Sequence, residues 1–600
     1  MQKIQTGLEK GIAFLKKPIV FSFIMAFFTY LTLVAFLQLP VYDILSLLLF
    51  VMCVMLYQNT KYKNVCSKEG LLLSILFAFL MILGRIIAHN LTNPNVSFLT
   101  ELLQFKNIIY LIGLGSLFFC LLMHLLPWLS QIQIRERKHS SKKKTWILFS
   151  LTVVFLLAAW LPYFLSYYPG TLSSDSLGEL QMIMDGFRSL SDHHPLLHVV
   201  FMAIPYQIGM ALFHSQTSAV GLISMTQMVI MASIFSYLVV YVYRRVRVKG
   251  LAFLVFLFFA LSPIFGYYSI TMWKDVLFGG LMVLLTMQTI KWTEKKESIT
   301  FQDAVSFIFL SLLTLFFRNN AIYMYFILTF CSFFVFKKEW KKILLIFFLV
   351  ISTYYFIKGP VFNMMHVQKS ASAEYLAIPL QQLGRIAYKD GDFSKEERHQ
   401  LKPLISVPKL KELYNPVVVD AIKFNEAYHG EVFDNNKGAY LKLWAGVVLK
   451  NPVVSVEAYL SSTLGYWYPN VEYWAVQKGV SDESYGVKNA PIDIPIMKKY
   501  VDTIETRTVP VVAMQWSIGL CVWLLFILGY ITVKRSGLRA IYPFIPILGI
   551  WLTMMVASPV YAEFRYMFCA FTTLPLLFVY TMTSEMKRKK KLKMKEGKLR

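Results

Sequence analysis

The chain has 600 residues, of which 56% are hydrophobic and 16% aromatic, and its mean hydropathy is +0.54. This composition excludes a set of soluble domains and predicts an all-α protein that crosses a membrane many times. The net charge of +26 is typical of nucleic-acid-binding proteins too, but the Lys and Arg residues fall in short blocks between apolar runs, as cytoplasmic flanks of membrane helices do. We therefore expect membrane lipids as partners and no nucleic acid.

Five apolar runs of spanning length open the chain, although the second is short. They lie near Ile19–Leu37, Ile44–Leu56, Leu71–Ile87, Ile108–Leu129 and Trp146–Phe164. Basic blocks occur before the first run, after the second and after the fourth. By the positive-inside rule these faces are cytoplasmic, and the fifth crossing then delivers the loop Tyr168–Pro195 to the outer face.

The loop Tyr168–Pro195 carries a carboxylate and two adjacent imidazoles directly beyond a membrane span. Ionisable groups at such a place are costly unless they are used. A turn at Tyr168-Pro169-Gly170 is followed by Ser174 and Asp175, either of which could cap a helix that runs through Met184. Two interpretations of Asp175 stay open: a helix N-cap or a functional carboxylate.

The run Leu196–Phe213 is apolar enough to cross the membrane, but the charge pattern argues against a crossing. If it crossed, the run Val220–Tyr243 would place Arg244 and Arg245 outside, against the positive-inside rule. We therefore predict that it lies along the outer interface, which gives about 14 crossings and cytoplasmic N- and C-termini. Four later basic blocks then become cytoplasmic: Lys291–Lys296, Lys337–Lys342, Lys534–Arg539 and Lys587–Arg600.

With this topology, four further connections reach the outer face and carry few charges. They are Thr271–Asp275, Arg318–Asn320, Lys358–Pro510 and Ser558–Tyr566. Each charge taken alone could be a snorkelling side chain at the interface. Because they share one face, we expect five side chains to converge on one cavity beneath the long outer segment: Asp175, His194, Lys274, Arg318 and Arg565.

The segment Lys358–Pro510 is the long polar part of the chain and predicts a mainly helical extracytoplasmic domain. Within it, Tyr466, Trp467 and Tyr468 form an aromatic cluster. Such a cluster is typical of a membrane-interface belt, and the alternative is a surface on which a sugar or acceptor stacks.

A carboxylate with imidazoles and cations suits a transfer from a lipid-phosphate donor to a hydroxyl acceptor. Such a reaction needs a base at the acceptor hydroxyl, for which Asp175 is suited, and cations that hold the departing phosphate. We predict the phosphate ligands to be His193, His194, Lys274, Arg318 and Arg565. We predict Asp275, Asn319 and Glu563 to support them.

These pieces resemble the GT-C class of polytopic glycosyltransferases, and more closely a largely uncharacterised bacterial branch of it. The likeness runs from about Trp146 to the last crossing and rests on Pro169-Gly170 with Asp175-Ser176, His193-His194-Pro195, Trp273-Lys274-Asp275, Arg318-Asn319-Asn320 and Phe564-Arg565-Tyr566. It implies a polyprenyl-phosphate-linked sugar donor, an active site on the outer face of the bacterial cytoplasmic membrane, and Asp175 as catalytic base. The acceptor would be an envelope glycan, a glycolipid or a protein.

One departure from that class is the sequence Ser174-Asp175-Ser176, where many relatives carry two adjacent acidic residues. No cofactor is therefore assigned, and a divalent metal is an alternative that the sequence does not favour. Asp192, His194 and His198 would be its ligands, since imidazoles at i and i+4 share a helix face.

The expected organisation has five parts. They are a four-crossing region 1–145, a GT-C-like core 146–357 with the catalytic outer loop 166–215, an extracytoplasmic domain 358–510, C-terminal helices 511–584 and a basic cytoplasmic tail 585–600. The alternative function is a transporter or flippase for a lipid-linked saccharide. The sequence lacks the paired broken helices of inverted repeats, and its polar residues cluster at one face, which favours the enzyme.

Overall fold

The structure is a computed structural model that describes residues 18–40, 43–59, 68–93, 96–131, 141–295, 299–369, 376–505 and 513–584. The predicted tail 585–600 and the N-terminal basic block lie outside the described residues. Within the described ranges every named element is helical, and the only β pairing consists of isolated bridges. The prediction of an all-α protein is confirmed.

The multi-pass character is confirmed as well. Among the described residues, 11 helices are long and apolar enough to cross a membrane, or 12 if the pair Lys249–Leu261 and Pro263–Ser269, bent by 56°, forms one span. Three shorter apolar helices accompany them: Ile44–Gln58, Phe301–Phe317 and Ala321–Val335. Length and composition alone therefore give fewer crossings than the 14 we expect.

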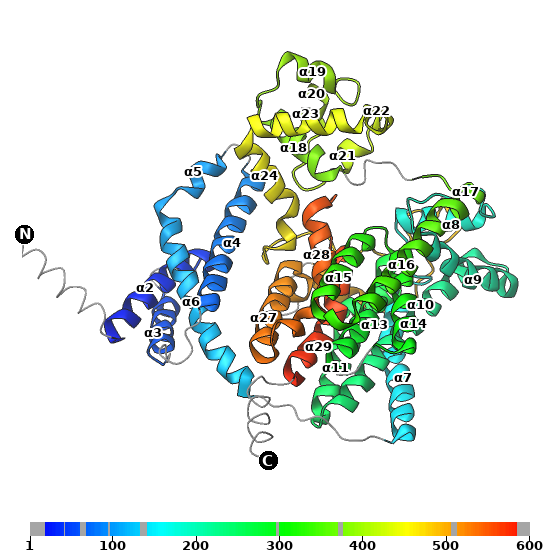
Figure 1. Ribbon diagram of the computed structural model, residues 1–600, viewed down its shortest axis with the longest axis horizontal. Helices are drawn as coiled ribbons and strands as arrows, with labels where there is room; N and C mark the ends of the chain where they lie inside the picture. Colours follow the sequence, from blue (N-terminus) through cyan, green and yellow to red (C-terminus); the bar gives the residue numbers. More distant parts are fainter. Residues whose placement is uncertain are drawn as a thin grey trace, which may run out of the picture.

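The helices form three groups (Figure 1). An N-terminal group, drawn in blue, contains α2 (Pro18–Leu37), α3 (Ile44–Gln58), α4 (Lys68–Thr92), α5 (Phe98–Leu102) and α6 (Phe105–Gln131). The core contains α7 (Lys142–Ser166), α10 (Gln216–Arg245), α11 (Lys249–Leu261), α12 (Pro263–Ser269), α13 (Lys274–Glu294), α14 (Phe301–Phe317), α15 (Ala321–Val335), α16 (Trp340–Phe356), α27 (Ile518–Ser536), α28 (Ile545–Ala557) and α29 (Phe568–Thr583).

The third group stands at one end of the core, at the top of Figure 1. It contains α18 (Ala377–Tyr388), α19 (Lys395–Leu401), α20 (Val407–Leu413), α21 (Asp420–Lys423), α22 (Gly430–Asn435), α23 (Lys437–Lys450) and α24 (Pro452–Thr463). These helices bury an apolar core of their own, which includes Leu380, Ile386 and Val447. Inside this group Arg385 forms a buried ion pair with Glu457.

Helix α13 lies at the centre of the core and is almost entirely buried. Gly279 and Gly280 allow α13 to pack closely against α29 and α10. A side chain at Gly279 would meet the Phe568 ring of α29, whose Thr572 hydroxyl donates to the Gly279 carbonyl at 2.9 Å. The packing fixes the start of α13, where Lys274 stands.

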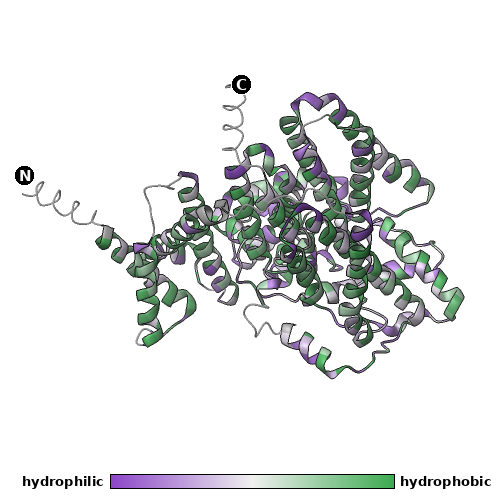
Figure 2. Cartoon of the chain, turned by 90° about the horizontal axis from the view of Figure 1, so that it is seen from below, coloured by the Kyte–Doolittle hydropathy of each residue, from purple (hydrophilic) through white to green (hydrophobic). Residues whose placement is uncertain are grey.

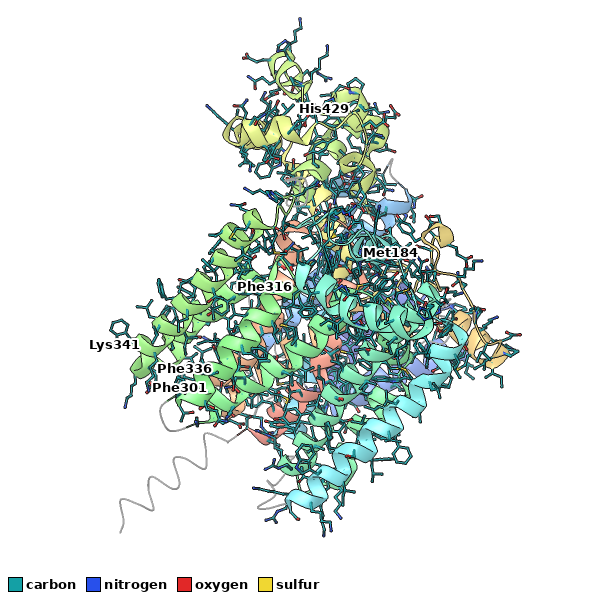
Figure 3. All side chains as sticks on the ribbon, turned by 90° about the vertical axis from the view of Figure 1, so that its right-hand side faces the viewer. Met184, Phe301, Phe316, Phe336, Lys341 and His429 are labelled. Carbon is teal, nitrogen blue, oxygen red and sulfur yellow. The ribbon has the colours of Figure 1, made fainter. Side chains whose placement is uncertain are left out.

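The two ends of the core carry different chemistry. At one end Arg245 bonds to Glu294 and donates to the Thr583 hydroxyl at 2.6 Å, so the last turns of α10, α13 and α29 meet there. The start of α14 lies at the same end, because Lys291 pairs with Asp303 at 2.6 Å. The opposite end, which we name the site end, carries the starts of α13 and α15 and the long polar segment. Figure 3 shows Phe301 and Phe336 together at the first end, far from His429 in the polar group.

Helix α9 (Leu196–Phe213) starts and finishes at the site end. It follows Pro195, and the next helix, α10, begins beside the polar segment, since the Lys488 amide donates to the Thr217 hydroxyl at 3.0 Å. Two turns further along α10, the Ser224 hydroxyl donates to the Pro169 carbonyl at 2.7 Å. One face of α9 is buried against α8 (Ser174–Met184) and Val480. The other face leaves apolar side chains exposed: Val200, Ile204, Ile208, Leu212 and Phe213.

The remainder of the long polar segment packs mainly on the membrane core. Leu172 bridges Val480, and the Ala490 amide donates to the Tyr168 carbonyl at 3.0 Å. After this stretch, which runs from Val480 to Ala490, α25 (Pro495–Glu505) lies against α7. The segment therefore links the loop before α8 to the polar helices above it.

Candidate functional site

A cavity of about 350 Å³ opens at the site end, between the core and α21 of the polar group. Seven of the side chains singled out in the sequence line it: Asp175, His193, Lys274, Asp275, Arg318, Asn319 and Arg565. They come from four stretches of chain that are far apart in sequence. The tertiary structure thus brings the predicted charges together beneath the polar helices.

Asp175 lies in the first turn of α8, but it does not cap that helix. The N-cap is Ser173, not Ser174 or Asp175, and no side chain caps the helix there. The Asp175 carboxylate instead accepts a hydrogen bond from Nη1 of Arg565 at 2.7 Å. Burial raises the pKa of the Asp175 carboxyl, but Arg565, Lys274 and His194 outweigh burial and hold that pKa well below its usual value. Asp175 is therefore an ionised carboxylate.

Arg565 is positioned by the short helix η9 (Phe564–Met567) and by the ring of Trp273, which lies 5.1 Å from the guanidinium carbon. Its Nε is 3.5 Å from Oε1 of Glu563. Glu563 is buried, and burial, with Asp275 and Asp175 nearby, raises the pKa of its carboxyl to about 7 against the pull of Arg565. Two carboxyl groups thus flank one guanidinium, and their pKa values are shifted in opposite directions.

Arg318 follows the last residue of α14 and is held mainly by the protein itself. Its Nη1 is 3.0 Å from Oδ1 of Asp275 and donates to the Tyr566 carbonyl at 2.8 Å. Its Nε donates to Asn320 at 2.7 Å. A guanidinium fixed in this way forms a rigid, positively charged part of the cavity wall.

Lys274 differs from the two arginines. Within the described part of the chain no hydrogen bond or ion pair engages its ammonium, although it lines the cavity. It is the first residue of α13, where the free backbone amides of the helix favour an anion. Lys274 is therefore the cation most available to a bound phosphate.

Asn319 links the cavity to two residues that the sequence analysis did not assign to the transfer site. Lys358 donates to the Asn319 side chain at 2.9 Å and pairs with Asp192 at 2.5 Å. Asn319 also donates to the Asp192 carbonyl at 3.2 Å. This network joins the start of the polar segment to the loop before α9.

His194 does not line the cavity, so its predicted role as a direct phosphate ligand is corrected. It is buried behind Asp175, and burial, with Lys274 nearby, lowers the pKa of its imidazole to about 4. Its Nδ1 lies 3.9 Å from Oε1 of Glu179. His193, in contrast, is exposed and faces the cavity.

Glu179 is a residue that sequence reasoning missed. It is buried and 2.6 Å from Nδ1 of His198. The available signal was its spacing, since a residue four positions after Asp175 shares a face of α8. Glu179 therefore anchors α8 to the start of α9 and holds the imidazoles behind the candidate base.

The alternative metal site is not formed by these side chains. Asp192 is engaged by Lys358, and His194 and His198 both face Glu179. No group of three His, Cys, Asp or Glu side chains suited to a metal ion occurs in the described ranges.

The predicted stacking surface at Tyr466, Trp467 and Tyr468 is wrong, because all three side chains are buried. The Tyr466 hydroxyl donates to the Val560 carbonyl at 3.0 Å, and the Trp467 ring donates to the Thr463 hydroxyl. The aromatic rings are packing residues that tie the polar segment to the core. The cavity wall instead includes Tyr566, which follows Arg565, and residues that the sequence did not single out: Tyr323, Asp420, Lys423 and Phe424.

Comparison with known proteins assigns the chain to a family. Residues 181–596 match the model of a family of unknown function, DUF6020. The match includes Lys274, Arg318 and Arg565, starts shortly after Asp175, and leaves out α2 to α7. No curated protein and no solved structure matches the chain. The protein belongs to this family of unknown function.

Proposed function

We propose that the protein is a GT-C-type glycosyltransferase that moves a sugar from a polyprenyl-phosphate donor to a hydroxyl acceptor. The observation that carries this proposal is the cavity in which the ionised Asp175 lies among Lys274, Arg318 and Arg565. A carboxylate accepts a proton and the cations bind a phosphate, which are the two tasks of such a transfer.

In the proposed step, the acceptor hydroxyl oxygen forms a bond to the anomeric carbon of the sugar while the bond from that carbon to the phosphate oxygen breaks. Asp175 takes the hydroxyl proton, and the lipid phosphate leaves as an anion. Lys274, which has no ion-pair partner among the described residues, and the start of α13 hold that anion. Arg318, fixed by Asp275, adds positive charge to the wall.

Donor binding would also activate the base. Without a donor, Arg565 lowers the pKa of Asp175, which makes the carboxylate a weak base. A phosphate that shares the Arg565 guanidinium brings negative charge close to Asp175 and raises its pKa. Asp175 would therefore become a stronger base once the donor is in place.

The proposal includes a topology. The core would have about 14 crossings with α9 on the outer interface, which is supported by its two ends at the site end and by its exposed apolar face. The site end would face outward from the bacterial cytoplasmic membrane, with cytoplasmic termini, because basic residues at the ends of spans, among them Arg245, Lys291 and Arg535, lie at the opposite end. The product would be a modified envelope glycan, glycolipid or protein.

The test uses full-length protein in lipid nanodiscs with radiolabelled polyprenyl-phosphate sugars. We expect release of the lipid phosphate and transfer of label to a hydroxyl acceptor. If labelled lipid crosses the membrane of proteoliposomes with its sugar still attached, and no donor is cleaved, the transporter or flippase alternative replaces the transferase.

A further inference from the structure

A second polar cavity, of about 630 Å³, lies between the N-terminal helices and the core. Helices α2, α4, α5 and α6 contribute most of its lining, and Tyr468 and Asn470 line it on the side of the core. Its charged residues are Arg85, His89, Glu101 and Lys106. The transfer reaction proposed above uses none of these groups.

Arg85 is the unusual feature of this cavity. It lies inside α4, an apolar helix of spanning length, roughly 10 Å along the axis before the helix ends. A guanidinium at such a depth is costly unless it serves a function. Its planar face lies against the rings of Phe36, at 4.5 Å, and Tyr110, at 5.6 Å, while Nη2 donates to the Ala35 carbonyl.

Another edge of the Arg85 guanidinium has an unsatisfied hydrogen-bond donor. Nη1 of Arg85 is buried and has no hydrogen-bond partner among the described residues. Among the described residues no ion pair joins Glu101 to Arg85, and Oε1 of Glu101 lies 2.8 Å from Nδ1 of His89. Lys106 adds a second cation to the wall. An unpaired guanidinium edge with a nearby ammonium is suited to a phosphate group.

Glu101 indicates a second property of the ligand, a hydrogen-bond donor. Its Oε2 is buried and also lacks a hydrogen-bond partner within the described ranges. A carboxylate oxygen accepts hydrogen bonds, so it would be satisfied by a hydroxyl of the same ligand. Apolar side chains lie beside these groups: Leu37, which lines the cavity, is 59% exposed, and Leu103 and Phe105, next in sequence to the polar lining residues, are 74% and 73% exposed. Together these features indicate a ligand with a phosphate, at least one hydroxyl and an apolar tail.

We propose that this cavity binds the headgroup of a membrane phospholipid that carries hydroxyl groups, with its phosphodiester on Arg85 and Lys106 and a hydroxyl on Glu101. The site lies at the site end, because α4 reaches the polar helix α24 there. Tyr468 separates the ligand from the core and packs on Gly84, where a side chain would come within 2.3 Å of the Tyr468 ring. A bound lipid would therefore contact the seam between the N-terminal helices and the core.

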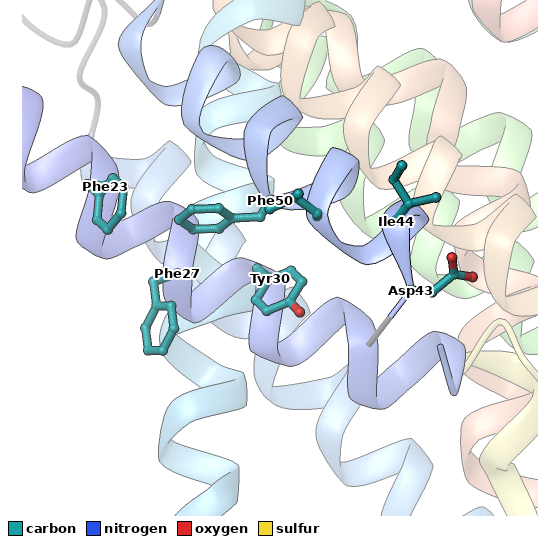
Figure 4. A pocket seen from close by; sticks show the side chains of 7 residues that line it. Phe23, Phe27, Tyr30, Asp43, Ile44 and Phe50 are labelled. Carbon is teal, nitrogen blue, oxygen red and sulfur yellow. The ribbon is translucent and has the colours of Figure 1, made fainter. Parts of the chain in front are cut away.

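A third cavity supports this choice by contrast. The groove between α2 and α3 is also about 630 Å³, and Phe23, Phe27, Tyr30 and Phe50 line it (Figure 4). Asp43 is the one charged residue among the described residues that line it, so it offers nothing to a phosphate. Most residues of the N-terminal helices are hydrophobic, as the colours of Figure 2 show, so the charges around Arg85 are an exception in this group.

Native mass spectrometry of the full-length protein with dioleoyl phosphatidylglycerol tests this site without any measurement of transferase activity. We expect Arg85→Gln to weaken binding of one lipid about tenfold, the loss expected for a charged hydrogen bond. Lys106→Ala should weaken it less. The exposed residues Arg188 and Lys395 provide matched controls, since Arg188→Gln and Lys395→Ala should bind as the wild type does.

Two further arms identify the ligand group. Dioleoylglycerol, which lacks the phosphate, should not show the Arg85-dependent binding. If inorganic phosphate stabilises the wild type as well as the lipid does, and Arg85→Gln abolishes both effects, the site is a free-phosphate site and the lipid assignment is wrong. Wild-type lipid binding by both Arg85→Gln and Lys106→Ala overturns the site itself. Lys106 is exposed, so its variant remains informative if Arg85→Gln does not fold.

Discussion

The guanidinium of Arg565 lies 2.7 Å from the carboxylate of Asp175, although the two residues are 390 positions apart. Arg565 comes from the short helix before the last span and Asp175 from the first turn of α8. The pair places an ionised carboxylate and a fixed cation in the same wall of one cavity. Any anion that binds there competes with Asp175 for Arg565, which couples anion binding to the basicity of the carboxylate.

The first prediction concerns Asp175→Asn. Because Ser173 and not Asp175 occupies the N-cap, the substitution keeps the shape of the helix and removes the base. We expect turnover to fall by about 10²–10⁴-fold, the usual contribution of general-base catalysis. The donor should bind at least as tightly as it does to the wild type, because Arg565 no longer pairs with a carboxylate. Asp185→Asn, at the other end of α8, is the matched control and should keep its turnover. If Asp175→Asn transfers at a near-native rate with every donor tested, Glu563 becomes the candidate base.

The second prediction distinguishes the role of Lys274 in donor binding from the role of Arg318 in stability. Lys274→Met removes the ammonium that has no ion-pair partner in the described ranges, so it should weaken donor binding about tenfold without a loss of stability. Arg318→Ala leaves Asp275 buried without its cation and should lower the free energy of unfolding by about 3–5 kcal/mol. Isothermal calorimetry and the midpoint of thermal unfolding measure the two effects.

The control for Lys274→Met is Lys442→Met, which removes an exposed ammonium from α23 and should leave both quantities unchanged. Equal donor affinity in Lys274→Met and in the wild type would remove Lys274 from the phosphate site.

The third prediction concerns pH and Glu563. Its pKa is about 7 in the folded protein, above the value of 4.5 for the unfolded chain, so the folded state binds the extra proton between these two values. The stabilisation is complete below about pH 4.5 and is lost as pH rises through 7. The loss is at most about 3 kcal/mol for a shift of this size. Glu563→Gln, which stays neutral, should show a smaller loss of stability from pH 5 to pH 8.

His194 changes the free energy of unfolding with the opposite sign. Its pKa is lowered from 6.5 to about 4 in the folded protein, so the unfolded state binds the extra proton between these values and stability rises with pH there. The difference in the free energy of unfolding between the wild type and Glu563→Gln isolates the effect of Glu563. The other titratable and charged groups are present in both proteins: His194, Arg565, Asp275, Asp175 and Asp420. Thermal unfolding at pH 5 and pH 8 measures it. A difference that is the same at both pH values would show that Glu563 does not titrate in this range.

The fourth prediction concerns topology. Single cysteines at Ser215, next to the end of α9, and at Ser481 should react with an impermeant maleimide from outside, in a background without native cysteines. Gln302→Cys, at the opposite end of the core, should react only after permeabilisation. Labelling of Ser215→Cys only after permeabilisation would mean that α9 crosses the membrane and that the charge argument fails.

The sequence by itself was sufficient to predict an all-α, multi-pass chain and to select Asp175, Lys274, Arg318 and Arg565. The reason is that charges are rare in so apolar a chain, and the alternation of basic blocks predicts a membrane face for each loop without any knowledge of packing. The first four helices gave no comparable signal, and Arg85 was passed over because it stands alone within an apolar run.

Only the tertiary structure decided which of these groups meet and which are hidden. The partners of Asp175 and of Arg318, and the placement of His194 behind the cavity with Glu179, depend on how α8, α13 and α29 pack. The aromatic cluster at Tyr466–Tyr468 has the composition of an exposed surface, yet it is buried because Gly465 allows the chain to approach Ala562. Burial and ion pairing are properties of contacts between distant segments, and a linear pattern does not contain them.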